Sequence, residues 1–77
     1  MYKEIFPIRL KSYRKEMGIK QTDIASNTGI PRTSINKYES GKIEPSIESI
    51  GKIADYLNVS VDWLIGREDK KIKRHPF

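Results

Sequence analysis

The chain has 77 residues, 36% of them hydrophobic and 32% charged, with a formal net charge of +5, and this length suits one small globular domain. No apolar run approaches the roughly 20 residues that span a bilayer, and the charged amino-terminal segment lacks the apolar stretch of a secretory signal. With no cysteine and a single histidine, the sequence offers no disulfide and no recognisable metal site. We therefore expect a cytoplasmic protein with no membrane partner, no metal and no cofactor.

A first helix is expected over residues 5–17. Pro7 is compatible with its first turn, and Gly18 ends it, since glycine readily adopts the left-handed conformation that closes a helix. The opposite side carries several basic residues, most of which suit a solvated face. The apolar residues that share one face at helical spacing are Phe6, Leu10, Tyr13 and Met17.

Residues 21–40 predict two short helices joined by a tight turn. The first, over residues 21–28, has Ile24 on its inward face and ends at Gly29. Ile30, the apolar residue of the turn, should point inward, and Pro31 opens the next helix, where its missing N–H costs nothing. The inward residues of this third helix are Ile35 and Tyr38.

The outward face of the third helix is rich in hydrogen-bonding groups. Arginine and lysine can reach guanine O6 and N7, asparagine can bond adenine, and a threonine methyl can contact thymine, so this face suits the DNA major groove. An ordinary solvated helix face would have a similar composition, and the helix taken alone favours that interpretation. The candidate base contacts are Arg32, Thr33, Asn36 and Lys37.

Two further helices follow. Ser46 is expected to cap a fourth helix that ends near Asn58, and Ser60 is expected to cap a short fifth helix. The fifth helix is unusually apolar because it contains Trp63, Leu64 and Ile65. The apolar face of the fourth helix is assigned to the core as Ile47, Ile50, Ile53, Ala54 and Leu57.

Charge is distributed unevenly along the chain. Lysine and arginine minus aspartate and glutamate gives +4 for residues 1–20, −1 for 21–30, +2 for 31–42, −3 for 43–66 and +3 for 67–77. A polyanion should approach the first and third helices and avoid the fourth and fifth. Residues 67–77 lack periodicity and are expected to form a flexible basic tail that follows a domain of residues 1–66.

The spacing of these residues resembles the helix-turn-helix of the phage repressor and Cro family, also known as lambda repressor-like or XRE. The resemblance extends from about residue 5 to residue 66 and implies an all-α, compact five-helix domain with its helix-turn-helix at about 21–40. It also favours base contact over simple solvation for the outward face of the third helix. The residues in register with the family are Arg14, Gly18, Gln21, Ile24, Ala25, Gly29, Ile35, Tyr38, Glu39, Gly41, Pro45, Ser46, Ile50, Ile53, Ala54, Leu57, Val59, Ser60, Asp62, Trp63, Leu64 and Gly66.

The resemblance assigns roles to individual residues. It implies that Arg14 pairs with Glu39 and holds the first helix to the third, and that Gln21 bonds a DNA phosphate and steadies the start of the recognition helix. The loop after the third helix is expected to lie along the phosphate backbone, with Lys42 as the candidate contact, and Ser34 is a further phosphate candidate.

Two residues depart from the family pattern. Lys20 stands where a threonine or serine usually caps the second helix, so that helix start should be weaker by about 1 kcal/mol unless Asp23 compensates. Lys20 is instead a candidate phosphate contact. Pro31 replaces a serine or threonine whose hydroxyl can contact DNA, so no such contact is expected here.

The fifth helix has two interpretations. Trp63, Leu64 and Ile65 either close the small core or leave part of their surface exposed as a dimer interface, which the family often places on its last helix.

The leading functional hypothesis is a sequence-specific transcriptional regulator, most often a repressor in this family, that binds a pseudo-palindromic operator in double-stranded DNA as a homodimer. The alternative is a small helical protein-binding module of the antitoxin or adaptor kind. An enzyme is not expected, because the sequence has no paired carboxylates, no nucleophile with a base and no phosphate-binding loop. No small-molecule ligand is evident.

Overall fold

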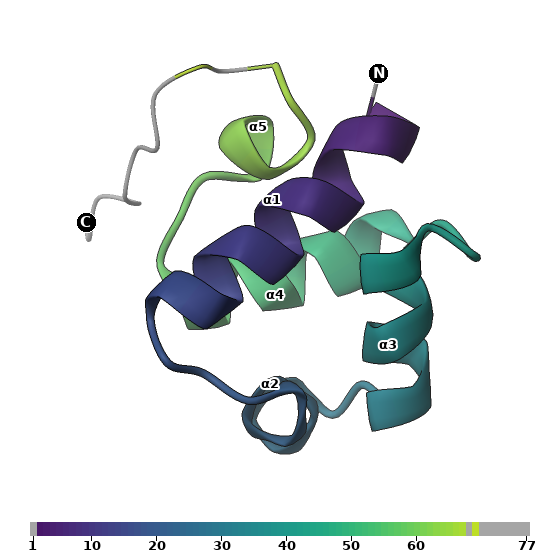
Figure 1. The fold of residues 1–77 in the computed structure, drawn as a ribbon, viewed down its shortest axis with the longest axis vertical. Coiled ribbons are helices and arrows are strands. Elements are labelled where there is room, and N and C mark those ends of the chain that lie inside the picture. The colour runs from purple at the N-terminus through teal and green to yellow at the C-terminus, as the bar shows by residue number, and fades with distance from the viewer. Residues whose placement is uncertain (1, 68, 70–77) are drawn as a thin grey trace.

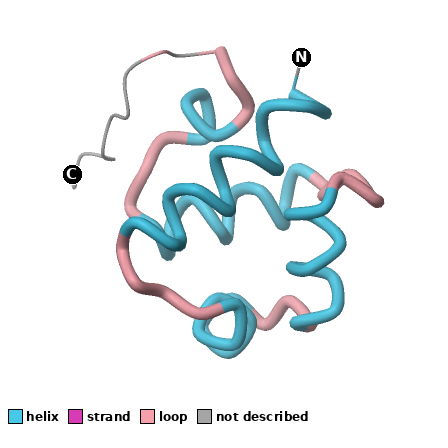
Figure 2. Tube along the Cα trace, in the orientation of Figure 1, coloured by secondary structure: helices cyan, strands magenta, loops and turns pink. Residues whose placement is uncertain are grey.

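The computed structural model describes residues 2–67 and residue 69, and every regular element in that part of the chain is a helix. Figures 1 and 2 show short loops connecting the helices. The predicted all-α, five-helix fold is confirmed, and the predicted span of the second helix agrees with the observed one. The helices are α1 (Tyr2–Glu16), α2 (Gln21–Thr28), α3 (Arg32–Ser40), α4 (Ile47–Leu57) and α5 (Val61–Leu64).

Local sequence signals account for most of the helix ends. The Ser46 hydroxyl oxygen accepts the Ser49 N–H at 3.1 Å, and the Ser60 oxygen accepts the Trp63 N–H at 2.9 Å, so both predicted caps form. Helix α2 ends at Gly29, whose φ of 79° lies in the left-handed region. Asn58 ends α4 with a φ of 59°, a conformation that asparagine tolerates better than most residues.

Helix α1 differs from its predicted bounds at both ends. It begins at Tyr2 rather than at residue 5, so Pro7 lies inside the helix and one backbone hydrogen bond to the preceding turn is missing. It ends at Glu16, and Met17, predicted to lie on the buried face, is 55% exposed. The prediction for Met17 was wrong because the helical repeat no longer applies once the backbone leaves the helix.

The core forms where α1 crosses the other helices. Helix α1 contacts α3 and α5, while α2 contacts α3 and α4, and α4 contacts α5. In Figure 1, α1 lies across the front of the molecule with α4 behind it, and α3 stands at one edge. The buried apolar residues are Phe6, Leu10, Tyr13, Ile24, Ile30, Ile35, Tyr38, Ile50, Ile53, Ala54, Leu57, Val59, Trp63 and Leu64.

Helix α5 closes the core. Trp63 is 8% exposed and Leu64 is fully buried, so these two residues do not form the exposed dimer interface that was one of the two interpretations. The Trp63 ring packs edge-on against Tyr13 with 5.8 Å between ring centres, and the Arg9 guanidinium lies 5.0 Å from its centre. Arg9 also donates to the Trp63 carbonyl at 2.6 Å, which joins α1 to the end of α5.

Ile47 is the one residue of the predicted α4 core face that is strongly exposed, at 86%. Its angular position on the helix nearly matches that of Ala54, seven residues later, which is fully buried. The face was therefore predicted correctly. The burial of Ile47 was not, because it is the first residue of α4 and lies at the end of the helix, where neighbouring helices no longer cover it.

Candidate nucleic-acid interface

The turn between α2 and α3 is closed by a side chain as well as by the backbone. The Thr28 hydroxyl donates to the Ile24 carbonyl at 2.6 Å and accepts the Ile30 N–H at 3.2 Å. Ile30 is 7% exposed and points inward as predicted. Pro31 has extended backbone angles and precedes α3, so the first helical residue is Arg32, one position later than predicted. This turn fixes how α3 leaves α2.

Helix α3 has one buried and one exposed face. Ile35 is fully buried, and Tyr38 packs edge-on against Phe6 with 6.2 Å between ring centres. The residues of the opposite face are all exposed and define what we call the reading surface: Arg32, Thr33, Asn36 and Lys37. Figure 1 shows α3 at the edge of the molecule, with only its inner side against the other helices.

The angular order of the reading surface limits what each residue can contact. Arg32 and Lys37 are five residues apart, which places them about 140° apart around the helix axis. Thr33 and Lys37 are four residues apart and differ by only about 40°. Arg32 and Lys37 therefore point in clearly different directions from the helix axis, whereas Thr33 and Lys37 point in similar ones.

The candidate phosphate contacts lie at the ends of the two helices. Lys20 precedes α2 and Lys42 follows α3, and both side chains are exposed. Gln21 and Ser34 are half-buried, each in the first turn of its helix. The Lys42 N–H donates to the Lys37 carbonyl at 2.9 Å, which ties the start of the following loop to the end of α3.

Helix α2 begins without a side-chain cap from Lys20, because an ammonium group has no lone pair to accept a backbone N–H. Asp23 supplies the other half of a capping box: its carboxylate accepts the Lys20 N–H at 2.9 Å. The start of α2 was predicted to be weaker unless Asp23 compensates, and the structure shows that Asp23 does so. The Lys20 ammonium remains exposed toward solvent.

Arg14 and Glu39 form a two-pronged ion pair. Arg14 Nε lies 2.6 Å from Glu39 Oε2, and Arg14 Nη2 lies 3.0 Å from Oε1. The side chains are only 12% and 3% exposed, respectively. Arg14 Nη1 also donates to the Ile19 carbonyl at 3.0 Å, so a single guanidinium joins α1, the next loop and the end of α3.

Two further hydrogen bonds extend this pair to the reading surface. Gln21 Nε2 donates to Glu39 Oε1 at 3.0 Å, and Arg32 Nη1 donates to Gln21 Oε1 at 3.4 Å. The sequence predicted each of these residues in the site but not that they form one chain of contacts. The signal was incomplete, because helix spacing does not report how side chains from three helices meet.

The structure also reveals an apolar groove between α4 and α5 that sequence reasoning missed. It has a volume of about 310 Å³ and is lined by Ile47, Ile50, Gly51, Val61 and Ile65. Ile65 is half-buried, so of the three residues predicted for a dimer interface it alone lies at this groove. The sequence feature that could have indicated the groove is Ile47, an apolar residue immediately after a helix cap, where few neighbouring residues can cover it.

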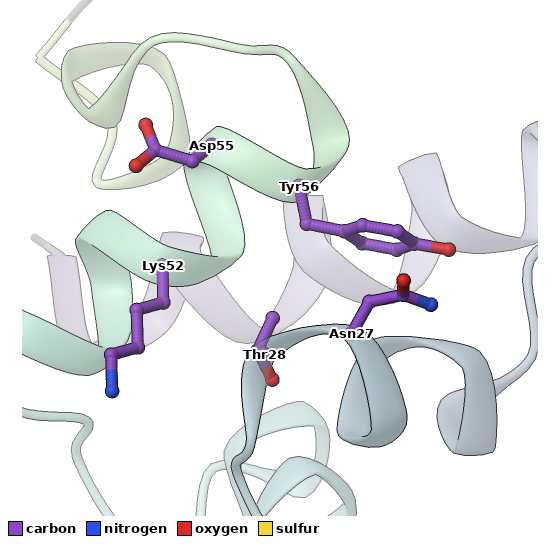
Figure 3. A pocket seen from close by; sticks show the side chains of 5 residues that line it. All are labelled: Asn27, Thr28, Lys52, Asp55 and Tyr56. Atoms are coloured by element: carbon purple, nitrogen blue, oxygen red, sulfur yellow. The ribbon is translucent and has the colours of Figure 1, made fainter.

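A second hollow, between α2 and α4, has no converging functional groups. Figure 3 shows the Tyr56 ring alongside Asn27, while Lys52 and Asp55 point in other directions. Among the residues that the structure describes, no three histidine, cysteine, aspartate or glutamate side chains are placed to hold a metal ion. The described helices are also all too short or too polar to cross a membrane.

Comparison with known proteins identifies a family and several relatives with similar sequences. Residues 10–64 match the Helix-turn-helix (HTH_3) family. The chain is 46% identical over 59 residues to the cryptic phage CTXphi transcriptional repressor RstR of Vibrio cholerae, covering 77% of this chain and 53% of that protein. It is 39% identical over 61 residues to the SPbeta prophage-derived uncharacterized HTH-type transcriptional regulator YonR of Bacillus subtilis, covering 79% and 56%.

One relative is covered almost completely. The uncharacterized HTH-type transcriptional regulator MJ0272 of Methanocaldococcus jannaschii is 34% identical over 61 residues, which are 79% of this chain and 92% of that protein. Against the first relatives named above, the chain spans about half of their length. The matched region contains α2, the turn and α3 in full, so the chain belongs to the helix-turn-helix family, in the phage repressor-like form that its motif residues predict.

Proposed function

We propose that this protein is a sequence-specific DNA-binding transcriptional regulator that acts as a repressor in the cytoplasm. The observation that carries the proposal is the reading surface: four exposed side chains with hydrogen-bonding groups on a helix whose other side is buried. Its relatives support the same activity, since RstR is named a transcriptional repressor. Repression would follow because the protein bound at its operator would sterically exclude RNA polymerase.

In this proposal α3 enters the major groove by its amino-terminal end. Arg32 and Thr33 then face neighbouring bases, and Lys37, more than one helical turn further along, reaches another base or a flanking phosphate. Asn36 is the remaining candidate for a base edge. The phosphate contacts, which hold the helix in register without reading sequence, are assigned to Lys20, Gln21, Ser34 and Lys42.

We also propose that two copies bind a pseudo-palindromic operator, because one nine-residue helix makes few base contacts. The apolar groove between α4 and α5 supports this part of the proposal. A two-fold dimer uses the same patch on both copies, and the exposed Ile47 together with the half-buried Val61 and Ile65 supplies such a patch. This replaces the interface centred on Trp63.

The domain is proposed to comprise residues 1–66 and the basic tail residues 67–77. Residues 68 and 70–77 lie outside the described part of the chain, so the tail enters the proposal only through its net charge of +3, which would add to attraction by DNA.

Selection of binding sites from random duplexes tests the proposal directly. We expect one enriched motif with two related halves about one helical turn apart, and binding that weakens steeply as salt rises. A titration against duplexes with one or both halves then tests the dimer. Recovery of no shared motif would refute the proposed function, and equal affinity for one and two halves would refute the dimer.

The same titration distinguishes a DNA-binding regulator from the alternative, a protein-binding module. The apolar groove between α4 and α5, with the exposed Ile47, is the feature that favours that alternative, since an adaptor would also need an apolar patch. A protein-binding module would show no preference for the selected duplex over a scrambled one.

A further inference from the structure

We propose that Glu39 positions Arg32 for base reading by setting the orientation of the Gln21 side-chain amide. This inference rests on the proposed function, in which Arg32 reads a base. Glu39 lies at the opposite end of α3 from Arg32, and Gln21, on α2, connects them. Glu39 is therefore a positioning residue that reaches the reading surface through another helix.

Glu39 and Gln21 differ in the hydrogen bonds that their side chains can form. An ionised carboxylate only accepts hydrogen bonds, whereas a glutamine amide has a donor NH₂ on one side and an acceptor oxygen on the other. Glu39 is anchored by two contacts from Arg14, at 2.6 and 3.0 Å, and its side chain is 3% exposed. The amide face that Gln21 turns toward Glu39 must therefore be its NH₂ group, as the 3.0 Å contact from Nε2 shows.

Once the Gln21 nitrogen faces Glu39, its oxygen must face the other way. That oxygen accepts from Arg32 Nη1 at 3.4 Å, a long contact that guides the guanidinium without locking it. Arginine has five N–H donors, so the remaining donors stay available for a base. The second N–H of the Gln21 amide is likewise available for a phosphate.

The reverse orientation would have the opposite effect on Arg32. If the Gln21 amide flipped, its NH₂ group would face the Arg32 guanidinium, and two donors cannot hydrogen-bond each other. Glu39→Gln creates this condition. The remaining oxygen keeps the shortest contact from Arg14, at the position of Oε2. An NH₂ group takes the place of Oε1, which removes the acceptor both of Gln21 and of Arg14 Nη2.

The test measures discrimination, defined as the ratio of affinities for the selected duplex and for a duplex changed at the base that Arg32→Ala identifies. Glu39→Gln should lower this ratio roughly threefold to tenfold, the range expected for one lost hydrogen bond. Arg14→Lys is the matched control, because it weakens the same ion pair but leaves the carboxylate facing Gln21. It should lower the melting temperature and leave discrimination unchanged.

Two further variants keep the test decisive. Gln21→Met removes the link but leaves both contacts between Arg14 and Glu39 in place, so it should reduce discrimination as much as Glu39→Gln even if the latter folds poorly. In an Arg32→Ala background, Glu39→Gln should cause no additional loss. Full discrimination in both Glu39→Gln and Gln21→Met would overturn the inference, and so would an equal loss in Arg14→Lys.

A measurement without DNA separates this inference from the proposed function. In the ¹⁵N-labelled chain, one hydrogen of the Gln21 side-chain amide should resonate downfield because a carboxylate accepts it, and Glu39→Gln should abolish that shift while Arg14→Lys retains it. An unchanged Gln21 signal in Glu39→Gln would refute the amide orientation. Failure of site selection, with the Gln21 signal changing as expected, would instead refute the proposed function alone.

Discussion

Replacing either partner of the Arg14–Glu39 pair with alanine should remove most of the stability of this domain. The two side chains are 12% and 3% exposed and are joined by contacts of 2.6 and 3.0 Å. Loss of one partner leaves the other as a buried charge without compensation, which costs about 3 to 5 kcal/mol. A core of this size gives only about 3 to 5 kcal/mol in total, so the variants should be near the unfolding threshold at 25 °C.

Thermal unfolding followed by circular dichroism gives the clearest measure of this effect. In a domain of 60 to 100 residues, 1 kcal/mol corresponds to roughly 4 to 8 °C, so a loss of 3 kcal/mol should lower the midpoint by at least about 12 °C. Arg14→Ala also removes the contact to the Ile19 carbonyl. The double variant should therefore be less destabilised than the sum of the single ones, because the stranded charge disappears with its partner.

The Glu48–Lys52 pair provides the control. It joins the two side chains across one turn of α4 at 3.5 Å, but they are 79% and 50% exposed, respectively. Such an exposed pair contributes about 0.3 to 0.5 kcal/mol, so Lys52→Ala should change the midpoint by no more than about 4 °C. Midpoint shifts for Arg14→Ala and Glu39→Ala no larger than that for Lys52→Ala would show that the pair does not hold α1 to α3.

Three further outcomes follow from particular residues. Gly66→Ala should lower the free energy of unfolding by about 1 to 3 kcal/mol, because φ there is +87° and a Cβ would lie 2.7 Å from a neighbouring side chain. Gly51→Ala, at an open helical position, should raise it by about 0.4 to 1 kcal/mol. Urea unfolding measures both changes, and changes of the same sign would contradict this expectation. Arg32→Ala should cost about 1 to 3 kcal/mol at the selected duplex and relax preference at one base, while Lys42→Ala should weaken all duplexes alike and reduce the salt slope by about one phosphate contact. Equal losses for selected and scrambled duplexes in Arg32→Ala would make that residue a phosphate contact only. Ile47→Asp should leave thermal unfolding unchanged, since the side chain is 86% exposed, but should abolish cooperative binding to the two-half duplex; retained cooperativity would place the dimer interface elsewhere.

Much of the fold around the candidate site could be predicted from the sequence because the signals involved are local. The bounds of α2, the capping serines of α4 and α5, and the left-handed residue Asn58 each depend on backbone geometry within a few residues. The two faces of α3 follow from the 3.6-residue repeat alone, with Ile35 and Tyr38 buried. The Arg14–Glu39 pairing was different, since it came from the family resemblance and not from spacing.

Burial at the helix ends, and the connection between helices, were decided only by the tertiary structure. Met17 and Ile47 occupy positions that periodicity assigns to the core, yet both are exposed. Met17 lies beyond the end of α1, where the helical repeat no longer sets its direction, whereas Ile47 has the predicted angle around α4 but no neighbouring helix over it. Trp63 is buried for the complementary reason: α1 lies over α5 and supplies Tyr13 and Arg9. The contacts from Glu39 through Gln21 to Arg32 join residues 18 and 11 positions apart on different helices, and such contacts exist only once the helices have packed.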